Sequence, residues 1–336
     1  MVKKKIKTKK KTIKKNKQYD IKNLKSGKII KTINNENNCI LKENNNTYKI
    51  KLLKKFSGGK SGDLVYLIKN KNNNYVLKIF METKSANHEI KLHKKHCEIF
   101  GKNSLIPYLY SEGIIQGIPF SDKISDIGKY RYLIMESINN PTELSDYIRS
   151  NCKKVKDKNI DPYLLSIQIF YYLSKLSRNK ISHCDLHTKN ILIIKSNSNL
   201  ILDFSFIEPN KKINVGKYRV KVIDFGLSEI NKPCPRNRRF IGAVLQDMRK
   251  CRVFKGSDIK DIKKDSIKII KSGLLKKKIK NEIIINEDFY IFSKILRLLN
   301  KIKTEDSKLT KFKIKFIEEL IIYKKNIKQI FNALIL

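Results

Sequence analysis

The side chains best suited to chemistry lie near the middle of the chain, in the thirteen residues ISHCDLHTKNILI (181–193). Two His, one Cys, one Asp and one Asn stand here between apolar flanks. Such side chains could form a metal site, a cysteine nucleophile with a histidine base, or a site of another kind. Their spacing, and the segments elsewhere that match it, decide among these.

A metal site and a thiol nucleophile are the less favoured interpretations. A thiol protease brings its Cys and His together from distant parts of the sequence, whereas Cys184 lies beside His183 and three residues before His187. Another candidate pair of metal ligands is His93 with Cys97, one helical turn apart. Because no third ligand follows at a suitable spacing, a structural role is favoured for this pair.

The favoured interpretation depends on two acidic residues and one amide. The segment HCDLHTKN places Asn190 five residues after Asp185, and the later segment VIDFGLS contributes Asp224. An Asp beside a hydroxyl group can orient it and accept its proton, while an Asn and a second Asp can ligate the metal that bridges phosphates. The two segments also contain His183 and Leu186, on either side of Asp185, and Phe225 and Gly226, directly after Asp224.

A glycine-rich connection between two predicted strands, FSGGKSGDLVYLIK (56–69), is suited to phosphates because glycine lets the backbone approach them closely. Its GKS is not the phosphate loop of NTPases, since Lys54 stands where that motif needs Gly and a strand follows instead of a helix. The strand-turn-strand context resembles instead the glycine-rich loop of kinases. That resemblance implies a nucleotide contact for Ser57, at the first glycine position, for Gly58, Gly59 and Gly62, and for Leu64, which replaces the usual Val.

A lysine inside the apolar segment YVLKIF is the next candidate. Lys78 is costly to bury unless a carboxylate pairs with it. Glu89, in the helix predicted to follow, is the candidate partner, and the pair could hold phosphates. The alternative is a lysine on an edge strand that points to water.

In this order, the segments resemble the protein-kinase superfamily over residues 48–255. The resemblance implies an α+β, two-lobed fold with a small β-rich N-lobe, a larger helical C-lobe, and ATP with Mg²⁺ bound between them. Asp185, Asn190, Lys78 and Glu89 would be catalytic, and Asn190 and Asp224 would hold the metal. Met135 would be the gatekeeper, and Glu136 and Ile138 would offer backbone hydrogen bonds to adenine.

Several positions depart from the usual pattern of that superfamily. His187 replaces a common Lys, which makes the segment similar to haspin-type atypical kinases and to aminoglycoside and choline phosphotransferases. Asn190 and Asp224 are 34 residues apart, a long spacing that haspin-like kinases share. Cys184 replaces the Arg that gathers an activation-loop phosphate in many kinases, so activity is expected without such phosphorylation.

The segment after Asp224 is short and lacks an Ala-Pro-Glu motif. The helix predicted soon after it contains Asp247, which we expect to be the buried acid that supports the catalytic loop. The basic stretch PCPRNRRF (233–240) is either a contact for an acidic or phosphorylated substrate or a solvated loop.

Hydrophobic periodicity supplies the elements that would position these residues. Strands are predicted at 47–56, 63–70, 75–80 and 130–137, and helices at 86–101, 141–150, 161–180, 286–302 and within 308–336. The predicted organisation is a basic, disordered tail (1–46), an N-lobe (47–138) and a C-lobe with basic C-terminal helices (139–336).

The formal net charge of +43 invites a nucleic-acid interpretation. Lys, Asn and Ile dominate, however, and their shared AT-rich codons explain much of the charge and fit a large DNA virus or a protist as the source. Non-specific binding to polyanions is expected in any case. Residues 1–17 contain ten Lys and are either a nuclear-import or polyanion-binding tail or simply solvated.

The six Cys are scattered without a Cys-x-x-Cys pair, and no apolar signal segment or membrane span is present. Reduced thiols, a cytoplasmic or nuclear location and no membrane partner are therefore expected.

The sequence predicts an ATP- and Mg²⁺-dependent Ser/Thr protein kinase of the atypical, haspin-like kind, acting on an unidentified protein. The alternatives are a small-molecule phosphotransferase and a pseudokinase or basic nucleic-acid-binding scaffold.

Overall fold

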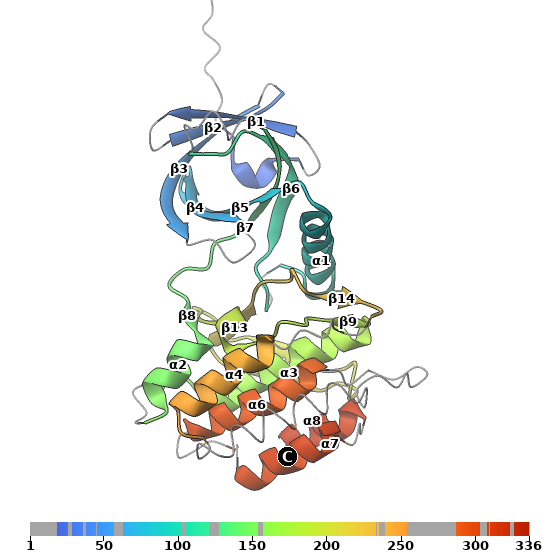
Figure 1. Cartoon of the computed structure of the whole chain (residues 1–336). Helices are drawn as coiled ribbons and strands as arrows, with labels where there is room; N and C mark the ends of the chain where they lie inside the picture. Colours follow the sequence, from blue (N-terminus) through green and yellow to red (C-terminus); the bar gives the residue numbers. More distant parts are fainter. Residues whose placement is uncertain are drawn as a thin grey trace, which may run out of the picture. The chain divides into compact units, whose positions relative to one another are not determined.

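The computed structural model describes residues 19–25, 29–35, 38–44, 46–56, 63–102, 105–120, 128–153, 157–232, 234, 239–253, 287–302, 308, 310–322 and 326–335. The chain divides into two compact units (Figure 1). The first comprises Met1–Glu82 and Tyr110–Met135, and the second comprises Thr83–Leu109 and Glu136–Leu336. Each unit has its own hydrophobic core.

The first unit is a closed barrel in which the strands neighbour one another in the order β1-β2-β3-β4-β5-β7-β6. Its strands are β1 (Ile29–Asn35), β2 (Asn38–Glu43), β3 (Asn46–Phe56), β4 (Leu64–Asn70), β5 (Asn73–Met81), β6 (Leu109–Gln116) and β7 (Lys129–Glu136). Strands β1 to β5 pair antiparallel in chain order, and the parallel pairing of β1 with β6 closes the barrel. Alternate side chains fill the interior, among them the fully buried Ile50, Ile68 and Leu77.

The predicted tail over residues 1–46 is wrong for the part of it that the structure describes. Strands β1 and β2 lie within this range, and alternate residues such as Cys39 and Leu41 are buried in the barrel. A short turn of helix before them, Ile21–Asn23, is fixed by buried Asn70, which accepts a hydrogen bond from Ile21 N at 2.8 Å. The period-two alternation was hidden by the Lys and Asn that face outward. Residues 1–18 lie outside the described part of the chain.

The second unit is mainly helical. Its described helices are α1 (Lys84–Phe100), α2 (Leu144–Asn151), α3 (Pro162–Arg178), α4 (Arg239–Lys250), α6 (Glu287–Lys301), α7 (Lys311–Ile322) and α8 (Ile327–Ile335). Helix α3 begins after Asp161, whose side chain accepts a hydrogen bond from Tyr163 N, with Pro162 in the first turn. It is central to the core, because the Phe170 ring contacts those of Phe289 and Phe292 on α6.

Three small sheets accompany the helices of the second unit. One has the order β13 (Tyr218–Val222), β10 (Ile191–Lys195), β8 (Thr142–Glu143), and another pairs β9 (Ile181–Ser182) with β14 (Glu229–Ile230). The third is the hairpin of β11 (Ile201–Asp203) and β12 (Lys212–Asn214), inserted between β10 and β13. This hairpin accounts for the long spacing between Asn190 and Asp224.

The predicted α+β class, with a β-rich N-terminal part and a larger helical C-terminal part, is confirmed. Most predicted elements lie within a few residues of the observed ones, and the stretch 308–336 contains two helices, α7 and α8. Among the described helices, none combines the length and apolarity that crossing a bilayer would require.

An aromatic cluster lies behind Phe225 in the second unit. The rings of His93 and His96, both on α1, contact the Phe225 ring at centroid distances of 5.0 and 4.1 Å. His93 also has Nε2 2.9 Å from the carbonyl oxygen of Pro107, so the structural role predicted for it is confirmed. His96 is fully buried, and burial lowers its pKa to about 3.

We predict that His96 makes folding sensitive to acid. An unfolded histidine takes up a proton near pH 6.5, whereas buried His96 stays neutral, so stability is highest above pH 6.5 and falls as the pH drops towards 3. His96→Phe should reduce the slope of the unfolding free energy by about 1.4 kcal/mol per pH unit between pH 4.5 and 6. Urea unfolding across that range measures it, and an unchanged slope would contradict the assignment.

Candidate active site

The loop that follows β9 is held by a buried carboxylate. Asp288, in the first turn of α6, accepts hydrogen bonds from the backbone N–H of His183 (2.6 Å) and of Cys184 (3.0 Å). Only 3% of Asp288 is exposed. Its carboxylate and the two backbone N–H groups therefore supply each other's hydrogen bonds in a place from which water is excluded. Cys184 has a φ of 63°, a left-handed conformation that side chains other than glycine seldom adopt and that is concentrated at functional sites.

Asp247, the residue expected to support the loop, holds its other end. It is buried on α4 and accepts hydrogen bonds from the Thr188 hydroxyl and from Arg149, whose Nη2 is 2.7 Å away. Sequence reasoning missed Asp288, which binds the loop backbone. The sequence contained a signal for it, because Asp288 stands directly before Phe289 and Tyr290 in the predicted helix 286–302. An acidic residue next to the apolar face of a helix is a candidate for burial with a hydrogen-bond partner.

Asp185 and Asn190 are in direct contact within the loop. The Asn190 amide nitrogen donates hydrogen bonds to the Asp185 carbonyl oxygen (3.0 Å) and to its Oδ2 (3.2 Å). Asp185 N donates to Nδ1 of His183, whose Nε2 then donates to the carbonyl oxygen of Ile223 at 3.2 Å. Burial lowers the pKa of His183 to about 4, so its ring remains neutral. A neutral ring can accept a hydrogen bond at Nδ1 and donate one from Nε2, as it does here.

Strand pairing brings Asp224 to the same loop. In the antiparallel register of β10 with β13, Ile191 faces Val222, and Ile223 N donates to the carbonyl oxygen of Asn190 at 2.9 Å. Burial, and then the negative charge of Asp224, raise the pKa of Asp185 to about 6. The three residues predicted from HCDLHTKN and VIDFGLS therefore form one acidic site, at which a cation would be favourable.

Glu89 lies beside the Asp-Phe-Gly segment within the second unit. A Cβ placed on Gly226 would be 3.2 Å from Glu89 Oε2 and 3.5 Å from Asp224 Oδ1. A side chain at position 226 would press on the Glu89 carboxylate and would meet Asp224 at ordinary contact distance, so glycine leaves Glu89 its room. The pairing of Glu89 with Lys78, which belongs to the other compact unit, stays a prediction.

Lys78 is not the lysine of an edge strand. It lies on β5, which has β4 and β7 as its neighbours, and only 15% of its side chain is exposed. Its Nζ is 3.2 Å from Asp63 Oδ2 and 4.6 Å from the centre of the Phe80 ring, and both residues belong to the same compact unit as Lys78. Asp63, just before β4, is a partner that sequence reasoning missed.

The other residues predicted to bind nucleotide are described only in part. The range 57–62, with Ser57, Gly58, Gly59 and Gly62, lies outside the described residues. Leu64 begins β4 and is half-buried. Met135 and Glu136, at the end of β7, and Ile138, two residues after it, are half-buried as well.

An ion pair that sequence reasoning missed connects Glu136 to the strand that leads to Asp224. Buried Lys221, on β13, lies 2.9 Å from Glu136 Oε2 and donates to the carbonyl oxygen of Ile106. Glu136 also interacts with Tyr108, because its N–H donates to the Tyr108 carbonyl oxygen and its Oε2 accepts from Tyr108 N. Glu136, the first of the two residues predicted to bond to adenine, is thereby fixed against β13.

His187 lies close to Asp185 without a hydrogen bond. Its Nε2 is 3.8 Å from Asp185 Oδ2, and its Nδ1 accepts a hydrogen bond from Lys189 N. Burial lowers the pKa of His187, so the side chain at this position is a neutral ring.

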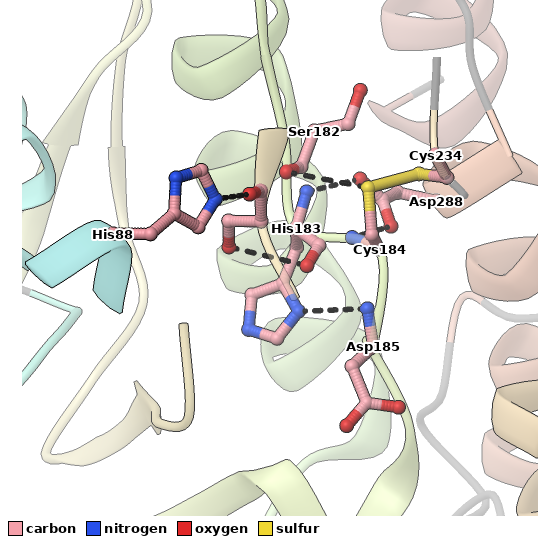
Figure 2. Close-up of a disulfide and its surroundings, with 8 residues drawn as sticks. His88, Ser182, His183, Cys184, Asp185, Cys234 and Asp288 are labelled. Carbon is pink, nitrogen blue, oxygen red and sulfur yellow. Dashed lines mark hydrogen bonds between the residues drawn. A yellow bond between two sulfur atoms is a disulfide. The ribbon is translucent and has the colours of Figure 1, made fainter. Parts of the chain in front are cut away.

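The expectation of six reduced thiols is wrong, because Cys184 and Cys234 form a disulfide (Figure 2). The pairing of β9 with β14 brings these two distant segments together, which no spacing in the sequence reveals. Residues 233 and 235–240 of the basic stretch have side chains outside the described part. Within the residues that the structure describes, no cluster of three or more His, Cys, Asp and Glu side chains suited to a metal is found.

The chain matches no protein-family model and no curated protein. Among the solved structures that it resembles is one described as WaaP in complex with acyl carrier protein, with a TM-score of 0.36 and 10% sequence identity, covering 65% of this chain and 89% of that one. At such low similarity, the assignment of the site depends on the residues and contacts described above.

We predict that Asp288→Asn destabilises the protein. The amide offers one acceptor oxygen in place of two, so one N–H of the loop loses its charged partner, at a cost of about 2–3 kcal/mol. Urea unfolding measures this loss, with Asp146→Asn as the control because Asp146 is an exposed carboxylate on α2. Equal stability of the two variants would contradict the role given to Asp288.

Proposed function

We propose that this protein transfers the γ-phosphate of ATP to a hydroxyl group in a Mg²⁺-dependent reaction, and that the acceptor is a Ser or Thr of a protein. The observation that carries the proposal is the hydrogen bond from Asn190 to Asp185, together with the proximity of Asp224, whose neighbour Ile223 bonds to Asn190 and whose charge acts on Asp185. The types and order of these three residues match phosphotransfer chemistry. The order of strands, helices and motifs along the chain supports a kinase-like arrangement.

The donor atoms of the site suit Mg²⁺, which prefers oxygen ligands. Asn190 uses its amide nitrogen to hold Asp185, which leaves Oδ1 as the amide atom able to ligate a cation. Asp224 would supply a carboxylate oxygen. Bound Mg²⁺ would neutralise negative charge on the phosphates during transfer.

Asp185 would act on the acceptor. Its carboxylate would accept a hydrogen bond from the hydroxyl group, orient its oxygen towards the phosphate, and take up the proton as the new bond forms. Asn190 keeps one carboxylate oxygen, Oδ2, in a fixed position, and neutral His183 holds the backbone of Asp185. The loop thus presents the base in one orientation, as efficient transfer requires.

The remaining predicted residues would bind the nucleotide. Lys78, with Glu89, would position the phosphates, and the segment of Ser57, Gly58, Gly59 and Gly62, with Leu64, would cover them. Met135 would limit the adenine pocket, and Glu136 and Ile138 would offer it backbone hydrogen bonds. The ion pair of Glu136 with Lys221 supports this role, since it fixes the backbone at that point.

A small-molecule hydroxyl is the second candidate acceptor, favoured by His187. A neutral ring near Asp185 can donate one hydrogen bond to a substrate, whereas lysine would present a full positive charge. The Asp-Phe-Gly-Leu-Ser segment favours the protein acceptor. The net charge of +43 would also allow non-specific binding of acidic proteins or nucleic acids.

We predict that Asp224→Ala removes both the thermal stabilisation by Mg·ATP and phosphate transfer, because it deletes a metal ligand. Asp185→Asn should keep the stabilisation but lower kcat at least about 100-fold, since it deletes the base. Thermal shift and radiolabel transfer to casein, histones, aminoglycosides and choline provide the measurements, with Asp203→Asn on β11 as the control.

Three results of these assays would decide the proposal. Full activity of Asp224→Ala would overturn phosphotransfer at this site. Transfer to choline or aminoglycosides alone would replace the protein acceptor by a small molecule. Salt-sensitive binding of nucleic acid without any effect of Mg·ATP would favour a basic scaffold instead.

A further inference from the structure

The disulfide between Cys184 and Cys234 encloses every residue proposed above to act on the metal or the acceptor. Its two cysteines are 50 residues apart, and Asp185, Asn190 and Asp224 all lie between them. One end of this covalent loop is the residue directly before Asp185. The other follows Asp224 by ten residues.

The segment after Asp224 is attached to the catalytic loop by a series of contacts that ends at the disulfide. The Ser228 hydroxyl donates to the carbonyl oxygen of His183 at 3.1 Å, and the Ser228 carbonyl oxygen lies 2.9 Å from Nε2 of His88 on α1. Glu229 then pairs with Ser182, and Asn231 N donates to the carbonyl oxygen of Lys180 at 2.8 Å.

Two features join the segment after Asp224 to the loop after β9: a short strand pairing and the disulfide. Strands β9 and β14 are two residues long each, too few to hold a segment firmly by backbone hydrogen bonds alone. A disulfide restricts the separation of its two ends, whatever the surrounding hydrogen bonds do. One of its two cysteines is Cys184, whose N–H Asp288 binds, so the disulfide attaches the segment to a point of the loop that is itself held.

We propose that the Cys184–Cys234 disulfide is a thiol–disulfide modification site that positions the segment from Asp224 to Cys234 for phosphotransfer, and that its reduction lowers turnover. The inference rests on the proposed function. Cys184 stands where many kinases have an Arg that binds a phosphorylated segment, and here a covalent bond makes the attachment. The two cysteines are positioning residues.

The reaction of this site is a two-electron exchange with a dithiol. The dithiol supplies two electrons and two protons, the S–S bond breaks, thiols form on Cys184 and Cys234, and the dithiol becomes a cyclic disulfide. Oxidised glutathione reverses the change. Because the cysteines are only 2% and 7% exposed, reduction requires the segment to open, and the oxidised form should persist in mild reductant.

The experiment compares oxidised and reduced full-length protein. Peptide mass spectrometry after alkylation should find residues 184 and 234 cross-linked in protein prepared without reductant. Prolonged treatment with dithiothreitol should lower kcat for transfer to casein at least about tenfold while changing the KM for ATP less than about threefold, and oxidised glutathione should restore it. Cys234→Ser should match the reduced wild type and no longer respond to either reagent.

A second measurement does not depend on activity. The backbone amides of 229–231 should exchange hydrogen at least about tenfold faster after reduction or in Cys234→Ser, because the pairing of β14 with β9 opens. Cys152→Ser is the matched control, since Cys152 is a buried free thiol on the same compact unit. This variant should respond to dithiothreitol as the wild type does.

The outcomes separate the two proposals. Equal transfer rates in the oxidised and reduced protein, or free thiols at 184 and 234 that oxidised glutathione cannot join, would overturn the positioning role and leave the proposed function intact. No transfer by cross-linked protein would overturn the proposed function and the effect on turnover. Unchanged exchange at 229–231 would overturn the attachment itself.

Discussion

The buried carboxylate of Asp288 is the interaction on which the candidate site depends. After β9 the chain has no regular partner for its backbone, and an unpaired buried N–H would be costly. Asp288 satisfies two consecutive N–H groups, those of His183 and Cys184, and they in turn compensate for its own burial. The left-handed backbone at Cys184, the residue directly before Asp185, is stabilised by these two hydrogen bonds.

The position of Asp288 is in turn a product of aromatic packing. Phe289 and Phe292, on the same helix, pack against Phe170 in the middle of α3, where large apolar side chains are fully buried. A hydrophobic core is closely packed and resists displacement. The helical core therefore determines where the carboxylate lies, and the carboxylate determines the loop.

The sequence predicted much of this site because its main residues are close together along the chain or belong to strongly patterned strands. Asp185 and Asn190 needed only their spacing, and Asp224 followed an apolar strand. The contacts that sequence could not provide are those across long separations. Asp288 with the loop, Lys221 with Glu136, and Cys184 with Cys234 each join segments from different elements, and their partners carry no local pattern.

The prediction for the first two strands of the barrel was wrong for a different reason. Strands β1 and β2 have the alternation that half-buried strands need, but Lys and Asn between the apolar residues gave them the composition of a disordered tail. Composition describes a whole segment, whereas burial selects every second side chain. In a chain so rich in lysine, periodicity is the better guide.

The hairpin of β11 and β12 lengthens the chain between Asn190 and Asp224 without changing where these two residues lie. Asn190 and Asp224 are held together by the ladder of β10 with β13, so the length of chain between these strands has little effect on the site. Phe204 anchors the hairpin by packing on Phe170 and Tyr171, while Pro209 and Asn210 at its turn are exposed. That turn is a permissive position for a reporter domain or an affinity tag, where a foreign sequence could be carried without disturbing the chemistry.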